Sequence, residues 1–178
     1  MLGNILPDKT ASRFPDTWFE TCLRRGAGLE MLTYWEPVAG ARVVCGVDLG
    51  HRKKIGSDRT VMITAVVYED GTRRVIDIRA GNWTGSEIVE NLEDVHDRFN
   101  AHIWVENNSA QQLLIDLGER FTAVPLYPHN THATNKGDLQ NGVEAIGRQM
   151  KKGKWAFPCD RTLIEAFAPG ALGSAGMR

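Results

Sequence analysis

The stretch from Arg42 to Gly50, RVVCGVDLG, decides the fold, because it is a short apolar run that ends in one carboxylate. Its length and its β-branched residues predict a strand that is buried on both faces. Asp48 lies where this strand would end, and burial of a carboxylate there costs free energy unless a partner compensates it. A divalent cation is one such partner when other carboxylates converge on the same place. The alternative is a turn-forming Asp that ends the strand and contacts water.

Length and composition indicate one globular domain. The chain has 178 residues, of which 42% are hydrophobic and 24% are charged, and this is enough for a single domain with a sizeable core. The net charge of -1 gives no general attraction to a polyanion. Any contact with nucleic acid therefore has to come from a local basic patch.

The cysteines and the N-terminus bear on the cellular compartment. Cys22, Cys45 and Cys159 are odd in number and contain no C-x-x-C pair, which argues against a disulfide framework and a structural zinc site. No apolar run approaches the roughly 18 residues that a membrane-spanning helix needs. Residues 1–10 lack the pattern of a signal peptide. We therefore expect a cytoplasmic protein with no membrane partner.

Periodicity and turn signals predict a mixed α/β order of elements. Strand patterns lie at 42–48, 60–68, 73–79, 102–106 and 122–127, with a short extended piece at 155–158. Helix patterns lie at 84–99, at 109–117, from 138 onward and at 161–167. The pair Asp70-Gly71 is a hairpin signal, so the first three strands should form an antiparallel meander. Thr84 and Glu87 form a capping box, and Pro125 either places the last of these strands at an edge or ends it early.

The predicted organisation has a connector at 1–40, a main domain at 41–167 and a flexible tail at 168–178. Prolines and glycines punctuate the connector. Within it, Asp16 would cap a short helix that carries its apolar residues on one side. This helix would either dock against a neighbouring domain or pack on its own domain, and the sequence leaves both interpretations open.

Two carboxylates lie at the ends of two predicted strands. The helix at 84–99 crosses over one face of the sheet, so the first and fourth strands can be parallel neighbours that bring Asp48 and Glu106 to one edge. Two close carboxylates repel each other unless a cation lies between them. Mg²⁺ or Mn²⁺ held by carboxylates is the chemistry of two-metal phosphoryl transfer. The alternative is two unrelated acids at strand ends.

Several short segments together resemble the nuclease domain of the large terminase subunit of tailed bacteriophages. They are VDLG at 47–50, SDRTV at 57–61, IWVENN at 103–108, TNK at 134–136 and GKWAFP at 153–158. FPDTW at 14–18 is similar to the connector that precedes this nuclease. The resemblance covers roughly 43–158, and it rests on the order and spacing of the segments.

The resemblance implies a ribonuclease H-like fold, with a mixed sheet of about five strands flanked by helices. It implies a metal-dependent endonuclease that cuts concatemeric viral DNA during genome packaging, with Mg²⁺ or Mn²⁺ in a two-metal site. The implied partners are double-stranded DNA, the terminase ATPase motor domain, the small terminase subunit and the portal. The implied location is the cytoplasm of a bacterial host cell, from a phage or a prophage.

The sequence departs from the family in two respects. It contains no G-x-x-x-x-G-K-[ST] motif, so it would be a nuclease fragment or a split subunit without motor activity. The family also completes its metal site with acids on a helix after the Phe-Pro segment. Asp160 and Glu165 are the carboxylates available there, and we take Asp160 as the third metal ligand. An incomplete site would make the chain a catalytically inactive docking module.

Basic residues flank the predicted site. Lys53, Lys54 and Arg59 follow Asp48 in the sequence, and cations there would position DNA phosphates without reading bases. Lys136 matches the family pattern and would orient water or hold a phosphate. A solvated loop and a helix lysine with no role are the alternatives. Lysines at 151, 152 and 154 form a second patch or favourable charges at a helix end.

Other functions share parts of this pattern. A junction resolvase or transposase-like nuclease of the same fold would use Asp48 and Glu106 on another DNA substrate. Gly-Val-Asp-Leu-Gly also opens sugar-kinase and actin-like ATPase folds, but those need a second glycine-rich phosphate loop and a second similar domain. His129 and His132 lie in a predicted loop, where histidines are mostly exposed and only sometimes bind a metal.

Overall fold

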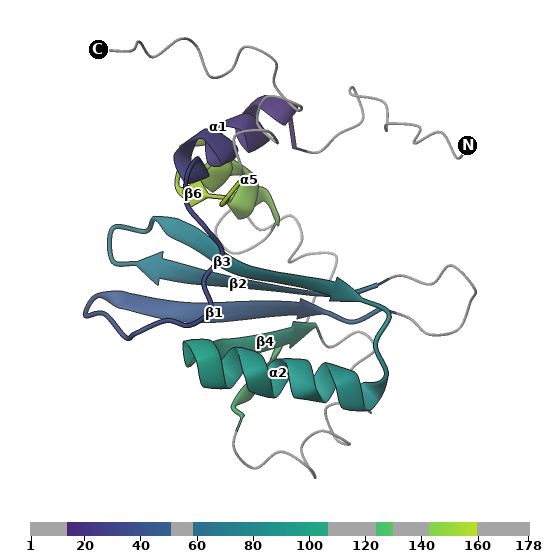
Figure 1. The fold of residues 1–178 in the computed structure, drawn as a ribbon. Coiled ribbons are helices and arrows are strands. Elements are labelled where there is room, and N and C mark those ends of the chain that lie inside the picture. Colours follow the sequence, from purple (N-terminus) through teal and green to yellow (C-terminus); the bar gives the residue numbers. More distant parts are fainter. Residues whose placement is uncertain (1–13, 51–58, 107–123, 130–142, 160–178) are drawn as a thin grey trace, which may run out of the picture.

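The computed structural model of the chain describes residues 14–50, 59–106, 124–129 and 143–159, and Figure 1 shows their arrangement. In chain order, the described elements are α1 (Asp16–Gly26), β1 (Ala41–Asp48), β2 (Thr60–Tyr68), β3 (Arg73–Gly81), α2 (Gly85–Phe99), β4 (His102–Glu106), β5 (Leu126–His129), α5 (Val143–Lys151) and β6 (Trp155–Ala156). None of the helices described here is long and apolar enough to cross a membrane.

The strands form one six-stranded sheet in the order β5-β4-β1-β2-β3-β6. β1, β2 and β3 pair antiparallel, which confirms the predicted meander. β4 pairs parallel with β1 and with β5, so the first and fourth strands are neighbours, as predicted. β5 lies at an edge, as Pro125 indicates. The sixth strand exceeds the predicted count of about five, because β6 adds a short parallel pairing to β3.

α2 covers one face of the sheet and forms the core with it (Figure 1). Ile88, Leu92, Val95 and Phe99 of α2 are buried, at the helical spacing seen in the sequence. They belong to one cluster with the inward-facing residues of the central strands. Among these are Val43, Cys45, Val47, Met62, Val66, Ile103 and Val105. The longest of the described helices therefore packs its apolar side on the central strands.

β1 is buried on one face only. Val43, Cys45 and Val47 are buried, whereas Gly46 and Asp48 are exposed. The prediction of a strand buried on both faces is therefore wrong. β1 has strand neighbours on both sides, but α2 packs on one of its two faces only. The apolar composition of β1 reflects its central place in the sheet. Asp48 is exposed, although a strand buried on both faces would have buried it.

We call the side of the sheet opposite α2 the open face, and part of it is covered, since Ala65 and Val75 are buried there. On β1 it carries the residues that alternate with the core, which are Arg42, Val44, Gly46 and Asp48. Apolar side chains on the neighbouring strands stay partly exposed there: Trp104 is 44% exposed, Ile63 43% and Ile78 51%. Trp104 also stacks on Tyr127 of β5, with ring centroids 5.1 Å apart. The open face therefore presents aliphatic and aromatic surface beside the ends of β1 and β4.

The predicted capping box starts α2. Thr84 Oγ1 accepts a hydrogen bond from the backbone N–H of Glu87 at 3.2 Å, and the Glu87 carboxylate accepts one from the backbone N–H of Thr84 at 2.6 Å. Two backbone donors at the helix start are thus satisfied by side chains. The helix ends at Asn100, which has a left-handed backbone with φ 48°.

Replacing Thr84 by alanine is expected to lower the free energy of unfolding by about 1 kcal/mol, because an N-cap hydroxyl is worth about that much. Urea denaturation followed by circular dichroism measures the difference. Thr84→Ser is the matched control, because serine keeps the hydroxyl that accepts the capping hydrogen bond from Glu87. Equal losses in the two variants would contradict the assignment of the cap.

α1 packs on α5 and β6, away from α2 (Figure 1). The backbone N–H of Phe157 donates to the carbonyl oxygen of Cys22 at 3.1 Å, and the Cys159 thiol donates to the carbonyl oxygen of Leu23 at 3.3 Å. The helix near the start of the chain therefore packs on later elements of the same chain. The predicted domain boundaries themselves stay a prediction.

The predicted cap of α1 is wrong in detail. The N-cap residue is Pro15, which makes no side-chain capping hydrogen bond, and Asp16 is the first helical residue. Its negative charge in the first turn still favours the positive end of the helix dipole. Pro15 stands in extended conformation just before the helix, where the backbone of a proline suits the turn into the first helical residue.

The segment between α1 and β1 is tied to the core. The backbone N–H of Leu32 donates to the carbonyl oxygen of Ile76 at 2.8 Å, and that of Trp35 donates to the carbonyl oxygen of Arg98 at 2.9 Å. Both side chains also pack against the core cluster. This connecting segment therefore runs across the α2 side of the sheet rather than leaving it.

Some predicted elements differ or fall outside the description. β5 begins at Leu126, later than the predicted start at 122, and Val124 and Pro125 precede it without strand pairing. The helices predicted at 109–117 and 161–167 lie outside the described residues, as does the tail 168–178. The helix predicted from 138 is described from Val143, where α5 is observed.

Candidate functional site

Asp48 and Glu106 end two neighbouring parallel strands. Val47 pairs with Val105, so the next residues, Asp48 and Glu106, hold equivalent positions at the carboxyl ends of β1 and β4. Because Val47 and Val105 point into the core, the two acids lie on the open face. Neighbouring strands are about 4.8 Å apart. The structure therefore places the two residues at neighbouring positions on adjacent strands, as the order of elements predicts.

His129 joins this arrangement from the next strand. It is the register partner of Glu106 on β5, and its side chain is exposed. Asp48, Glu106 and His129 thus follow one another across β1, β4 and β5 on the open face, and we call them the polar row. The prediction that His129 lies in a loop is wrong, because β5 runs through Pro128, a residue that is uncommon within strands. Because Tyr127 lies opposite Trp104, the residue two positions later, His129, lies opposite Glu106.

The two acids of the polar row differ in their surroundings. Asp48 is exposed, whereas Glu106 is half-buried between β1 and β5. A half-buried carboxylate is held more rigidly than one at the rim, and the outer one is more accessible to a ligand from solvent. The arrangement suits a group that approaches from the open face and contacts Asp48, Glu106 or both.

A hydrogen bond joins the residues on either side of the segment 51–58. The backbone N–H of Gly50 donates to Thr60 Oγ1 at 3.1 Å, and Thr60 is buried at the start of β2. This bond joins the two ends of the basic segment beside the polar row. Sequence reasoning did not single out Thr60, since a threonine at a strand start is unremarkable by itself.

The donor atoms present fit a hard divalent cation. Carboxylate oxygens are the ligands that Mg²⁺ and Mn²⁺ prefer, and Asp48 and Glu106 supply them from adjacent strands. Within the described ranges, no three His, Cys, Asp or Glu side chains come close enough to form a complete metal cluster. Asp160, the predicted third ligand, lies outside the described residues, and so does Glu165.

The cysteines are not candidates for nucleophilic chemistry. Cys22, Cys45 and Cys159 are all buried free thiols, which agrees with the expected absence of a disulfide framework. Burial raises the pKa of Cys45 to about 11, and burial likewise raises the pKa of Cys22 to about 11. Both stay protonated near neutral pH, and a protonated thiol is a poor nucleophile.

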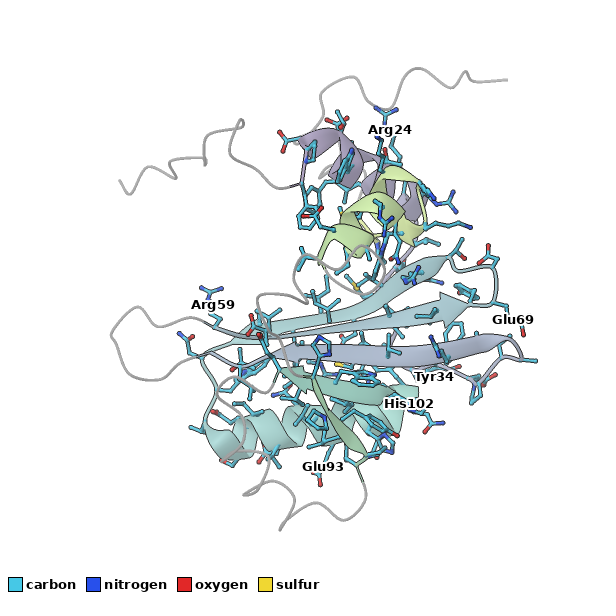
Figure 2. All side chains as sticks on the ribbon, turned by 180° about the vertical axis from the view of Figure 1, so that it is seen from behind. Arg24, Tyr34, Arg59, Glu69, Glu93 and His102 are labelled. Atoms are coloured by element: carbon cyan, nitrogen blue, oxygen red, sulfur yellow. The ribbon has the colours of Figure 1, made fainter. Side chains whose placement is uncertain are left out.

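Arg59 is the predicted DNA-contacting residue that lies within the described ranges. Arg59 is exposed next to β2, at the end of the sheet where Asp48 lies, and Figure 2 shows it at the opposite end from Glu69. Lys53, Lys54 and Lys136 lie outside the described residues. Lys154 donates to the carbonyl oxygen of Asp70 at 3.0 Å, so this lysine braces the β2–β3 turn.

The architecture can be compared with solved structures. A crystal structure of the large terminase nuclease from thermophilic phage G20c superposes on 78% of this chain and 75% of that one, with a TM-score of 0.51 at 15% sequence identity. The fold is ribonuclease H-like. At this identity the likeness concerns the fold alone, and it confirms the predicted fold class. The sequence matches no protein-family model, and no curated protein matches it significantly.

Proposed function

We propose that this ribonuclease H-like chain is a DNA endonuclease of the large-terminase type that depends on Mg²⁺ or Mn²⁺. The observation that carries the proposal is the register of Asp48 with Glu106 at the carboxyl ends of β1 and β4. The fold shared with the phage terminase nuclease supports it. The short sequence segments that resemble this family support it independently.

The residues of the polar row would have different roles in DNA hydrolysis. Asp48 and Glu106 would hold the ions and so place the phosphate over the open face. Such bound ions would supply the activation of a water molecule and the stabilisation of the leaving oxygen during phosphodiester hydrolysis. Exposed His129, beside Glu106, is placed to donate a hydrogen bond to the Glu106 carboxylate or to a phosphate oxygen. Asp160 would complete the ligand set.

The substrate we propose is concatemeric viral DNA during genome packaging. Exposed Arg59, with Lys53, Lys54 and Lys136, would neutralise the phosphates that flank the cut. The implied partners are the terminase ATPase motor, the small terminase subunit and the portal, in the bacterial cytoplasm. The motor would deliver the duplex to the polar row, since the 178 residues contain no P-loop motif.

The purified chain is expected to nick supercoiled plasmid with millimolar Mn²⁺ or Mg²⁺ and to leave it intact in EDTA, because the carboxylates need the ions to bind the phosphate. Agarose gels measure the conversion to open-circle and linear forms. A linear duplex and a four-way junction of equal length are compared in the same buffers. Cutting in EDTA, or no cutting by folded protein with either ion, contradicts the proposed mechanism. Preference for the junction favours a resolvase.

A further inference from the structure

A pocket lies at the end of the sheet opposite the polar row. This pocket of about 460 Å³ opens where β1 begins and β2 turns into β3. Arg42 and Arg73 line it, together with backbone at Gly40 and Gly71. Arg42 pairs with Val67 and Val67 pairs with Arg73, so the two arginines belong to one row across three strands. We call this the arginine pocket.

Arg73 is held in place before any ligand arrives. Its Nη1 donates to the carbonyl oxygen of Gly71 at 2.6 Å, and its guanidinium lies 5.5 Å from the ring centroid of Trp155. A guanidinium has five N–H donors in a rigid fork, and the Gly71 bond uses one nitrogen of it. Stacking on an aromatic ring leaves the edge of the fork able to bind an oxyanion in two-point fashion.

The two arginines are not neutralised by acids within the described part of the chain. Neither takes part in any of the ion pairs found there, which involve Arg24, Arg79 and Arg98. Burial lowers the pKa of Arg73, and the nearby charge of Arg42 lowers it further, so the two charges sense each other. Glu69 also lines the pocket, and it is an exposed side chain at the rim. Two cations that share a pocket are stabilised by an anion between them.

The arginine pocket and the polar row lie along the same strand. Arg42 and Asp48 are six residues apart on β1, about 20 Å at 3.3 Å per residue. Both belong to the open face, because they alternate with the buried residues of β1. Between them stands Gly46, where a side chain would meet nothing within 4 Å. Gly46 thus leaves space along β1, whereas on β2 and β3 the same side of the sheet carries Ala65 and Val75, which are buried. A separation of 20 Å is about six base-pair steps of B-DNA.

We propose that the arginine pocket binds a backbone phosphate of the DNA duplex, about six base pairs from the phosphate at the polar row. This rests on the proposed function for the meaning of the polar row, but the pocket itself contacts no cutting residue. Arg73, preordered on Trp155, would supply a bidentate contact, and exposed Arg42 would supply a second charge. Phosphate contacts of this kind fix orientation and register without reading sequence.

The test is binding of a fluorescent duplex of about 24 base pairs in EDTA, measured by anisotropy between about 50 and 200 mM salt. Removing one phosphate contact is expected to reduce the slope of log Kobs against log[salt] by about 0.9. Arg42→Gln and Arg73→Gln should each do so, and the double variant should lose about 1.8. Arg24→Gln is the matched control, because this exposed arginine lies on α1, far from the pocket (Figure 2).

Each outcome decides the proposal. An unchanged slope in the folded double variant overturns it, and so does an equal loss in Arg24→Gln, which would show a general charge effect. Arg42 is exposed, so Arg42→Gln carries the test even where Arg73→Gln fails to fold. Inorganic phosphate that displaces the duplex at micromolar concentrations would identify a free-phosphate site and overturn the DNA assignment. No binding of the duplex by the wild type does the same.

The assay separates this proposal from the proposed nuclease function. Because EDTA prevents metal-dependent cutting, the salt slope reports contact alone. A slope that falls as expected, in a chain that never nicks plasmid, supports the pocket and contradicts the nuclease. Plasmid nicking with unchanged slopes in the arginine variants supports the nuclease and contradicts the pocket.

Discussion

Replacing Asp48 by asparagine is expected to lower the rate of Mn²⁺-dependent plasmid nicking by about 100-fold or more. Loss of a residue that only supports a metal ligand costs 10- to 100-fold, so loss of a ligand itself should cost at least the upper value. Glu106→Gln should have an effect of similar size, because the two carboxylates occupy equivalent positions on adjacent strands. Initial rates of plasmid conversion at saturating Mn²⁺ measure both.

The fold should survive these substitutions. Asp48 is exposed at a strand end, and asparagine keeps its shape, so the free energy of unfolding should change by no more than about 0.5 kcal/mol. Glu93→Gln is the matched control: it removes one exposed carboxylate from α2, on the other side of the sheet (Figure 2). A rate for folded Asp48→Asn that equals that of Glu93→Gln would remove the polar row as the cutting site.

Replacing Gly26 by alanine is expected to destabilise the protein by about 3 kcal/mol, because overpacking against rigid backbone is costly. A methyl group at this position would stand 1.8 Å from the carbonyl oxygen of Phe157 and 2.2 Å from its carbonyl carbon. Backbone atoms cannot rotate away as the end of a side chain can. α1 would have to separate from β6, and the hydrogen bond from the Phe157 N–H to Cys22 would break.

Gly46→Ala is the control for this substitution. Nothing lies within 4 Å of the position that a side chain would occupy at Gly46, which is exposed on the open face. There, alanine should be neutral or stabilising by up to about 1 kcal/mol, since it reduces the entropy of the unfolded chain. Urea denaturation gives both differences, and hydrogen exchange of the Phe157 amide reports the docking of α1. Equal stability of the two variants would show that α1 does not press on Phe157.

Local signals in the sequence were sufficient for the central elements. Strand alternation, the Asp70-Gly71 turn and the capping box at Thr84 and Glu87 act over a few residues, and each element appears where they predict it. The parallel pairing of β1 with β4 also followed, because a helix between two strands returns the chain to the same sheet in one direction. The juxtaposition of Asp48 with Glu106 is a consequence of that order.

Contacts between distant segments decided the rest. The pairing of Trp155 with Arg73, the packing of α1 on Phe157 and the place of His129 beside Glu106 join residues far apart in the chain. No local pattern specifies such a partner, because register depends on which face each strand buries. The same holds for β1, whose apolar run looked fully covered while α2 shields one side of it.

The sequence by itself thus determined the mixed α/β order of elements, the meander, the main helix and the two strand-end acids. Their physical causes are short-range: periodicity, turns and caps. Only the tertiary structure decided that α2 covers one side of β1, that His129 extends the polar row, and that Arg42 and Arg73 share a pocket. These depend on strand register and on which surfaces the helices cover, and both are set by packing of the whole chain.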